Sequence, residues 1–357
     1  MALWCDKYRP NSLSKLDYNK DQAEYIRRMI KGNDFPHLLI YGAPGSGKRT
    51  RVQCILRELF GNSVDKTRIE HSIVETPSKK KLELNVITSN YHVEVNPSDL
   101  GIYDRLVIQD VMKNIAQSGG LVSSVPFKVV VVSDAHRLSR EAQHSLRRTM
   151  EKYYSTLRLI MCGDTSSTIL PPIKSRCLLL RVAAPSVERI TGILTHVAKK
   201  ENFSIDYELV KKIAIESGRN LRRALLMMET MHINGTKEII KPSHVLFIQN
   251  IAKKMTENPS LDNIREIRED YYELESHLIP SELIFIVLIK SLISMDYILD
   301  ERIRAKLLKL ASHYEYQMRI GNKRILHFEA FATHFMSINE TYREDLVKML
   351  EDDIMEI

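Results

Sequence analysis

Short apolar runs and helical repeats follow one another along the first half of the chain. The apolar runs predict buried strands at Leu38–Tyr41, Tyr91–Val95, Lys128–Val132, Leu157–Cys162 and Leu178–Val182. Between them, apolar residues three and four positions apart predict helices at Asp21–Lys31, Thr50–Phe60, Asp104–Ser118 and Arg140–Lys152. This alternation is typical of a parallel sheet covered by helices on both faces. The period-two run Leu82–Val86, with Lys79–Leu84, predicts a hairpin inserted beside the sheet.

After Val182 the pattern becomes entirely helical. Ser186 is a candidate N-cap, and helices are predicted at Tyr207–Glu216 and Asn220–Met231. Pro259 and Pro280 divide the remainder, where the apolar faces of Leu283–Leu292 and His327–Phe335 indicate either helix packing or contact with a neighbouring subunit. Because 357 residues are long for one core, we expect three domains. They are an α/β domain at 1–182, a small helical lid at 183–238 and a helical domain at 239–357.

Composition narrows the class of protein. A hydrophobic content of 44% with 27% charged residues is ordinary for a soluble globular protein. No apolar run could span a bilayer and no secretory signal is recognisable, so we expect an intracellular protein without a membrane partner. The four cysteines have no CxxC spacing, which indicates neither a zinc site nor a disulfide framework. No metal ligands are predicted.

The net charge of +7 favours a polyanionic partner. Bases outnumber acids in residues 136–152, whereas acids outnumber bases in residues 340–357. The basic residues considered as contacts with the phosphates of such a partner are Arg105, Arg140, Arg147, Lys79, Lys80 and Lys81. Solvated helix faces, and for the lysine run a solvated hairpin edge, are the alternative interpretation.

A glycine-rich loop follows the first predicted strand and precedes a predicted helix, which is the context of a phosphate-binding site. Its candidate nucleotide-binding residues are Gly42, Ala43, Pro44, Gly45, Ser46, Gly47, Lys48, Arg49 and Thr50. The glycines allow a close approach of backbone to phosphate, successive N–H groups and the helix N-terminus favour anions, and Lys48 would reach the terminal phosphates. We expect ATP or ADP as the ligand.

Two metal-binding positions of this pattern are altered. Arg49 stands where a Ser or Thr hydroxyl would bind Mg²⁺, and Thr50 cannot replace it because one residue turns a helical side chain by about 100°. After the strand Lys128–Val132, Ser133 replaces a metal-binding Asp, and Asp134 stands where a longer Glu would orient water. The sequence thus favours nucleotide binding and weakens the case for Mg²⁺ and for hydrolysis. Arg49 is expected to place a fixed positive charge near the altered metal position.

Four further motifs carry a resemblance to a known family. They are Trp4–Pro10, Ala142–Glu151, Pro172–Cys177 with its Ser-Arg-Cys box, and Gly218–Arg222. In these motifs the chain resembles the small subunits of the eukaryotic replication factor C clamp loader, an AAA+ family. The match runs through most of the chain and is densest in the first 230 residues.

The resemblance implies an AAA+ core, a helical lid and an all-α collar. It assigns Tyr8, Arg9 and Pro10 to the adenine side, Arg222 to phosphate sensing, and Arg176 to catalysis in trans at a neighbouring subunit's site. Asp164 departs from the asparagine that active members carry at the sensor strand. One kind of small subunit, at the end of the family's spiral, combines a degraded loop with an intact Ser-Arg-Cys box. The motifs Arg319–Lys323 and His327–Phe331 resemble that subunit.

The implied function is that of a small subunit in a nuclear heteropentamer. With a large subunit and three other small ones, it would use ATP to load a ring-shaped, PCNA-like sliding clamp onto primer–template DNA in replication and repair. Its own site would bind nucleotide with little or no hydrolysis. One alternative is a shared scaffold or regulatory subunit of checkpoint, cohesion or unloading assemblies. Another is a free-standing DNA-dependent ATPase, against which Ser133 argues.

Overall fold

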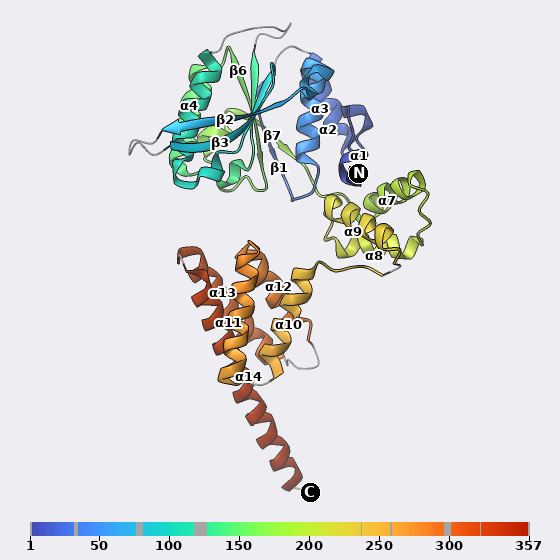
Figure 1. The fold of residues 1–357 in the computed structure, drawn as a ribbon, viewed down its shortest axis with the longest axis vertical. Coiled ribbons are helices and arrows are strands. Elements are labelled where there is room, and N and C mark those ends of the chain that lie inside the picture. The colour runs from blue at the N-terminus through green and yellow to red at the C-terminus, as the bar shows by residue number, and fades with distance from the viewer. Residues whose placement is uncertain are drawn as a thin grey trace. The chain divides into compact units, whose positions relative to one another are not determined.

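A computed structural model of the chain describes residues 2–31, 35–75, 81–117, 127–236, 238–257, 259–295, 301–321 and 323–355. The chain divides into two compact units, Met1–Ile239 and Ile240–Ile357 (Figure 1). Lys79, Lys80, Ser118 and Asn322, which the sequence places in predicted elements or motifs, lie outside the described residues.

A seven-stranded mixed sheet forms the centre of the first unit, in the order β2-β3-β4-β5-β6-β1-β7. Its strands are β1 (His37–Tyr41), β2 (Arg68–Glu75), β3 (Lys81–Thr88), β4 (His92–Val95), β5 (Lys128–Val132), β6 (Leu157–Gly163) and β7 (Cys177–Arg181). The five strands from β4 to β7 pair in parallel, while β2, β3 and β4 pair antiparallel. The predicted hairpin is thus β2–β3, beside the parallel strands.

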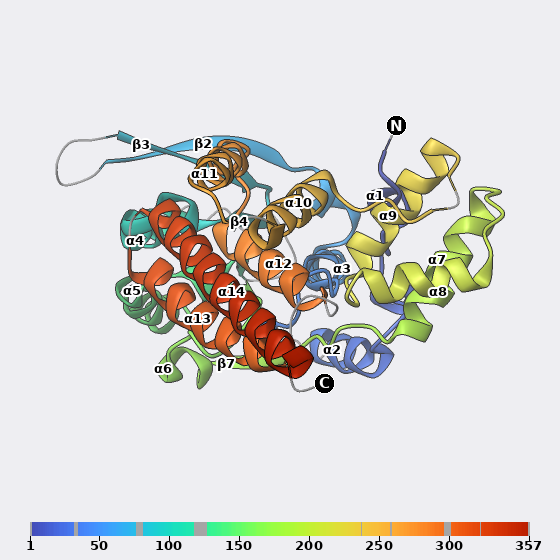
Figure 2. The ribbon, with the colours of Figure 1, turned by 90° about the horizontal axis from the view of Figure 1, so that it is seen from below.

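Helices cover both faces of this sheet, as the alternation of elements predicts (Figures 1 and 2). They are α2 (Lys20–Lys31) and α3 (Lys48–Phe60) on one face, and α4 (Asp104–Gln117) and α5 (Arg140–Lys152) on the other. In β5, Val129 and Val131 pack in the core shared with α2 and α3, whereas Val130 and Val132 pack in the core shared with α4 and α5. Successive residues of a buried parallel strand face two cores, and the predicted fold class is confirmed.

Three further helices of the first unit surround a core of their own. They are α7 (Val187–Lys200), α8 (Tyr207–Glu216) and α9 (Leu221–Asn234), while the short α1 (Trp4–Lys7) and α6 (Pro171–Lys174) lie earlier in the chain. Ser186 caps α7 by accepting the Arg189 N–H, as predicted. Trp4 is buried in the same core, so the N-terminal segment packs against the lid helices.

The second unit is entirely helical. It contains α10 (Ser243–Glu257), α11 (Leu261–Ser276), α12 (Ser281–Ile293), α13 (Glu301–Ile320) and α14 (Arg324–Met355). Phe285, Leu288, Phe331 and Phe335 are among the buried residues of its core, so both predicted apolar faces pack inside this unit. The C-terminal part of α14 continues past the other helices of the unit (Figure 1). Within the described ranges, no helix combines the length and apolar character that a membrane span requires.

Candidate functional site

The phosphate loop predicted at Gly42–Arg49 connects the end of β1 to the first turn of α3. Gly45 and Gly47 have φ angles of +70° and +74°, a conformation that side chains disfavour. A Cβ at Gly47 would also lie 2.6 Å from the Tyr18 hydroxyl. Only glycine fits here, which supports the sequence interpretation of these positions as a backbone cradle for phosphate.

Lys48 closes the loop upon itself. Its Nζ donates to the carbonyl oxygens of Gly42 and Ala43 at 2.7 and 3.0 Å and forms an ion pair with Asp164 Oδ1 at 2.7 Å. Asp164 is in turn tied to His136, whose Nδ1 accepts the Asp164 N–H at 3.3 Å. The residue predicted to occupy the sensor position thus contacts the loop lysine directly. A phosphate that recruits Lys48 would have to compete with this carboxylate.

A cavity of about 570 Å³ lies beside the loop, between the N-terminal segment and the lid helices. The predicted site residues among its lining are Tyr8, Arg9, Pro10, Gly45, Gly47, Thr50 and Arg222. The structure therefore gathers the predicted adenine-side residues, part of the phosphate loop and the lid residue Arg222 around one space. Its volume lies within the range of small-molecule and cofactor sites.

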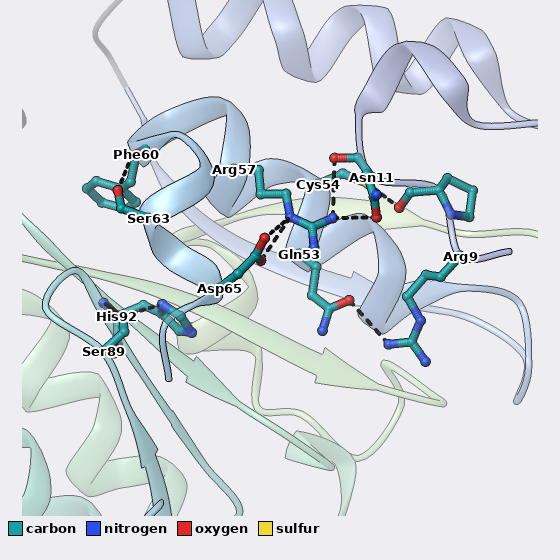
Figure 3. A network of polar contacts seen from close by, with 11 residues as sticks. Arg9, Asn11, Gln53, Cys54, Arg57, Phe60, Ser63, Asp65, Ser89 and His92 are labelled. Atoms are coloured by element: carbon teal, nitrogen blue, oxygen red, sulfur yellow. Dashed lines mark hydrogen bonds and ion pairs between the residues drawn. The ribbon is translucent and has the colours of Figure 1, made fainter. Parts of the chain in front are cut away.

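Helix α3 holds the N-terminal segment in place beside this cavity (Figure 3). Arg9 Nη1 donates to the Gln53 side chain at 3.2 Å, and the Cys54 thiol donates to the Pro10 carbonyl at 3.4 Å. Arg57 Nη1 donates to Asn11 Oδ1 at 2.9 Å, while its Nε forms an ion pair with Asp65 at 2.9 Å (Figure 3). The helix that begins in the phosphate loop thus also positions the adenine-side motif.

The same segment is held by the lid. Glu201 Oε1 accepts from the Tyr8 hydroxyl at 2.5 Å and pairs with Lys7 Nζ at 2.7 Å. The hydrogen bonds from Lys7 and Tyr8 lower the pKa of Glu201 below its ordinary value. The backbone N–H of Trp4 donates to Glu229 at 3.2 Å. Residues 4–11 therefore bridge the lid helices and α3.

Two residues that sequence reasoning missed, Tyr18 and Arg51, support the phosphate loop. The Tyr18 hydroxyl donates to the Ser46 carbonyl at 2.6 Å, and Arg51 Nη2 donates to the Tyr18 carbonyl at 3.0 Å. Arg51 is only 2% exposed and its guanidinium lies over the Tyr18 ring. Burial lowers the pKa of Arg51. An arginine within the apolar stripe of α3 is the sequence signal that could have revealed this pair.

The altered metal positions are joined by a third residue, Glu94, which sequence reasoning also missed. Glu94 lies on β4, next to β5. Its Oε1 is 3.1 Å from Arg49 Nη2 and accepts from Ser133 Oγ at 3.3 Å. Asp134 follows with a left-handed φ of +47°.

This set of side chains does not fit Mg²⁺. The ion requires an octahedron of oxygen ligands, whereas here a guanidinium and a neutral hydroxyl share one carboxylate. Among the described residues, no group of three or more His, Cys, Asp or Glu side chains could hold a metal ion.

Arg176 lies away from the loop lysine, beside the C-terminal end of α5. Its Nη2 forms an ion pair with Glu151 Oε1 at 2.5 Å, and its Nη1 donates to the Pro172 carbonyl at 2.7 Å. Arg147 Nε shares the same Glu151 oxygen at 3.4 Å. Burial raises the pKa of Glu151, but the hydrogen bonds and charges of the two arginines outweigh it and lower the pKa overall. In the isolated chain, Glu151 thus holds Arg176.

The candidate phosphate contacts lie on α4 and α5. Arg105 pairs with Glu141 at 3.2 Å, and a cavity of about 460 Å³ between the two helices is lined by both residues together with His144, Arg147, Arg148 and Glu151. Arg140 is exposed at the start of α5, and Lys81 is exposed at the start of β3. The structure gathers Arg105 and Arg147 around one cavity, and Arg140 does not line it.

Buried Asp104 also shapes this surface. It accepts from the Ser139 N–H and hydroxyl at 2.7 and 2.9 Å. Ser139 in turn caps α5 by accepting the Ala142 N–H at 3.1 Å. The start of α5 is thus fixed from α4.

Three family models match the chain: "DNA polymerase III, delta subunit" at residues 18–186, "RCF1/5-like, AAA+ ATPase lid domain" at 192–233, and "Replication factor C subunit 3, C-terminal domain" at 244–343. The chain is similar to replication factor C subunit 3 of Homo sapiens, with 45% identity over 97% of this chain and 98% of the relative. It is 44% identical to the Mus musculus subunit 3 over the same shares. It is 43% identical to Neurospora crassa subunit 5, over 96% of this chain and 98% of the relative.

Among solved structures, the RuvB Holliday junction branch migration motor of Thermotoga maritima is similar, with a TM-score of 0.47 and 16% identity. The alignment covers 74% of this chain and 85% of RuvB. The relatives of high identity cover almost the whole chain, and the family models follow one another along it. The chain therefore belongs to the replication factor C family, in the group whose members are called subunit 3 or subunit 5.

Proposed function

We propose that this chain is a small subunit of a heteropentameric clamp loader that uses ATP to open a PCNA-like sliding clamp and to place it on primer–template DNA. Its partners are a large subunit and three other small subunits, in the nucleus, during replication and repair. Within the chain, residues 1–182 and 183–238 form the AAA+ core and lid, and residues 239–357 form the collar. Family membership over nearly the full length supports this assignment.

The observation that carries the proposal is the separation of two functions within the chain. The phosphate loop, the adenine-side motif and Arg222 meet at one cavity, whereas Arg176 is held by Glu151 at the end of α5. Because Arg176 does not line this cavity, we assign it to a neighbouring subunit's nucleotide, where it would leave Glu151 and stabilise the charge on the transferred phosphoryl group.

The chain's own site is suited to holding ATP or ADP without hydrolysis. Ser133 brings no carboxylate to a metal, and Asp134 is one methylene shorter than the glutamate that would orient water. Asp164 pairs with Lys48 in place of a neutral sensor side chain. Bound nucleotide then stabilises the contact of core, lid and N-terminal segment, and the complex relies on other sites for turnover.

DNA phosphates would contact the basic side chains of α4 and α5, principally Arg105, Arg140 and Arg147, with Lys79, Lys80 and Lys81 as further candidates. Such contacts give binding that is independent of sequence and weakened by salt.

The test is Arg176→Ala in the reconstituted pentamer, assayed without DNA. Turnover at the neighbouring site should fall by roughly three orders of magnitude or more, so total ATPase loses that site's share while assembly is intact. Arg147→Ala is the matched control, because it removes the other guanidinium from Glu151. Unchanged ATPase in the Arg176 variant, or an equal loss in the control, contradicts the proposal.

A further inference from the structure

Arg49, Glu94 and Ser133 form a continuous polar cluster at the carboxyl ends of β4 and β5. Arg49 reaches it from the first turn of α3. Its Nη2 lies 3.1 and 3.2 Å from the two carboxylate oxygens of Glu94, and Glu94 Oε1 also accepts from the Ser133 hydroxyl. Two of these three positions are those at which the phosphate-loop pattern requires magnesium ligands. In this cluster the guanidinium of Arg49 is the positive charge at the place where the pattern would otherwise bind a magnesium ion.

Charge and hydrogen bonding explain how the Arg49 guanidinium can take the role of Mg²⁺ at this site. A guanidinium near the phosphate loop repels a divalent cation, and it can bind phosphate oxygens in pairs. Glu94 binds Nη2 of Arg49, whereas a guanidinium has five N–H donors. The Arg49 side chain is 56% exposed and that of Glu94 is 18% exposed. Arg49 thus has donors open to a ligand, while Glu94 holds it against the sheet.

We propose that the Arg49–Glu94 pair is a built-in cation that replaces Mg²⁺, so that this chain binds nucleoside di- and triphosphates without any divalent metal. This inference rests on the nucleotide binding proposed above. It assigns Arg49 to direct contact with phosphate and Glu94 to positioning of the guanidinium. Ser133 Oγ restrains the carboxylate from the side of β5.

The experiment measures ADP affinity of the purified full-length chain by equilibrium titration, in excess Mg²⁺ and in EDTA. For the wild-type chain the two dissociation constants should agree within about threefold, because a hydrogen bond to a charged group, not a metal, sets the affinity. Arg49→Thr should weaken binding in EDTA by roughly 10- to 100-fold, the usual effect of losing such bonds. Mg²⁺ should then partly restore it, since the new hydroxyl can bind the ion.

Arg49→Thr combined with Ser133→Asp supplies both missing ligands and should give the strongest dependence on Mg²⁺. Arg27→Thr is the matched control: the same change at an arginine of α2 that is paired with Glu58 at 2.9 Å and does not line the cavity. It should alter neither dissociation constant. Glu94→Gln should leave binding independent of Mg²⁺, because Glu94 binds Arg49 and no metal.

Wild-type binding that weakens more than about tenfold in EDTA overturns the inference and leaves the proposed nucleotide binding intact; this measurement requires no variant to fold. A wild-type dependence on Mg²⁺ that disappears in Glu94→Gln would identify Glu94 as a metal ligand instead. Unchanged affinity in Arg49→Thr would assign the pair a purely structural role. Failure of ADP to bind in either buffer contradicts the proposed function itself.

Discussion

His37, the first residue of the strand that leads into the phosphate loop, should make the stability of the first unit depend on pH. Its side chain is buried, and its Nδ1 accepts the Leu159 N–H from β6 at 3.0 Å. Burial, with the charge of Arg158 as a smaller cause, lowers the pKa of His37 from 6.5 to about 4. The folded state therefore keeps this imidazole neutral under conditions that protonate it in the unfolded chain.

The sign and size of the effect follow from linkage. Between pH 6.5 and about 4 the unfolded chain binds a proton that the folded chain does not bind, so acid favours unfolding. The contribution is fully present above the unfolded pKa and is lost as the pH falls toward the folded one. Since one pKa unit corresponds to about 1.4 kcal/mol, the whole loss is about 3 kcal/mol.

The perturbation is His37→Asn, which keeps an acceptor near Nδ1 for Leu159 and removes the titrating ring. Urea unfolding would be followed by circular dichroism and by the fluorescence of Trp4, the chain's single tryptophan, which is buried in the same unit. From about pH 7.5 to about pH 4.5, the difference in unfolding free energy between wild type and variant should move by about 2–3 kcal/mol in favour of the variant. An equal difference at both pH values would refute the reasoning.

Two further changes test the surfaces around α5. Asp104→Ala should lower the free energy of unfolding by about 2–4 kcal/mol in urea titrations, because the Ser139 N–H loses a buried charged acceptor; a loss below about 1 kcal/mol contradicts this. Glu151→Gln should raise turnover at the neighbouring site by roughly two- to fivefold, seen as a smaller rise in the total ATPase of the reconstituted pentamer, because Arg176 no longer has to leave an exposed ion pair before it reaches that site. A lower rate would mean that Glu151 positions Arg176 instead of restraining it.

Local signals predicted most of the fold. Arg140–Lys152 and Tyr207–Glu216 begin and end where the sequence places them, because each has a clear apolar repeat. A hairpin was predicted here, but no bounds were predicted for its first strand, β2 (Arg68–Glu75). Ile69 and Ile73 of this strand are exposed, so no buried face marks it, and its ladder with β3 supplies the pairing. Because this pairing depends on the partner strand, the residues of β2 show little pattern that would indicate a strand.

The candidate site likewise contains features that the sequence predicts and features that it does not. The phosphate loop was predicted because the spacing of its residues carries their chemistry, and Arg222 was predicted because its motif resembles that of the family. Their contacts were not: Glu94, 45 positions from Arg49, was missed, and Asp164, although predicted as the sensor residue, was not predicted to pair with Lys48, 116 positions away. Only the order of strands in the sheet brings these carboxylates to the loop, and a single sequence does not state that order.

The N-terminal segment has a mechanical consequence. Trp4 is embedded among the lid helices, while Arg9 is bound to α3. Even fully extended, the residues between them span no more than about 18 Å. The segment lines the cavity and connects the lid to α3 over at most this length, so it limits how far the lid can move from the phosphate loop. A wider movement of the lid requires Trp4 or Arg9 to leave its contacts. The rate of nucleotide exchange should therefore depend on how tightly the first ten residues are bound, and a fusion placed there would alter this rate.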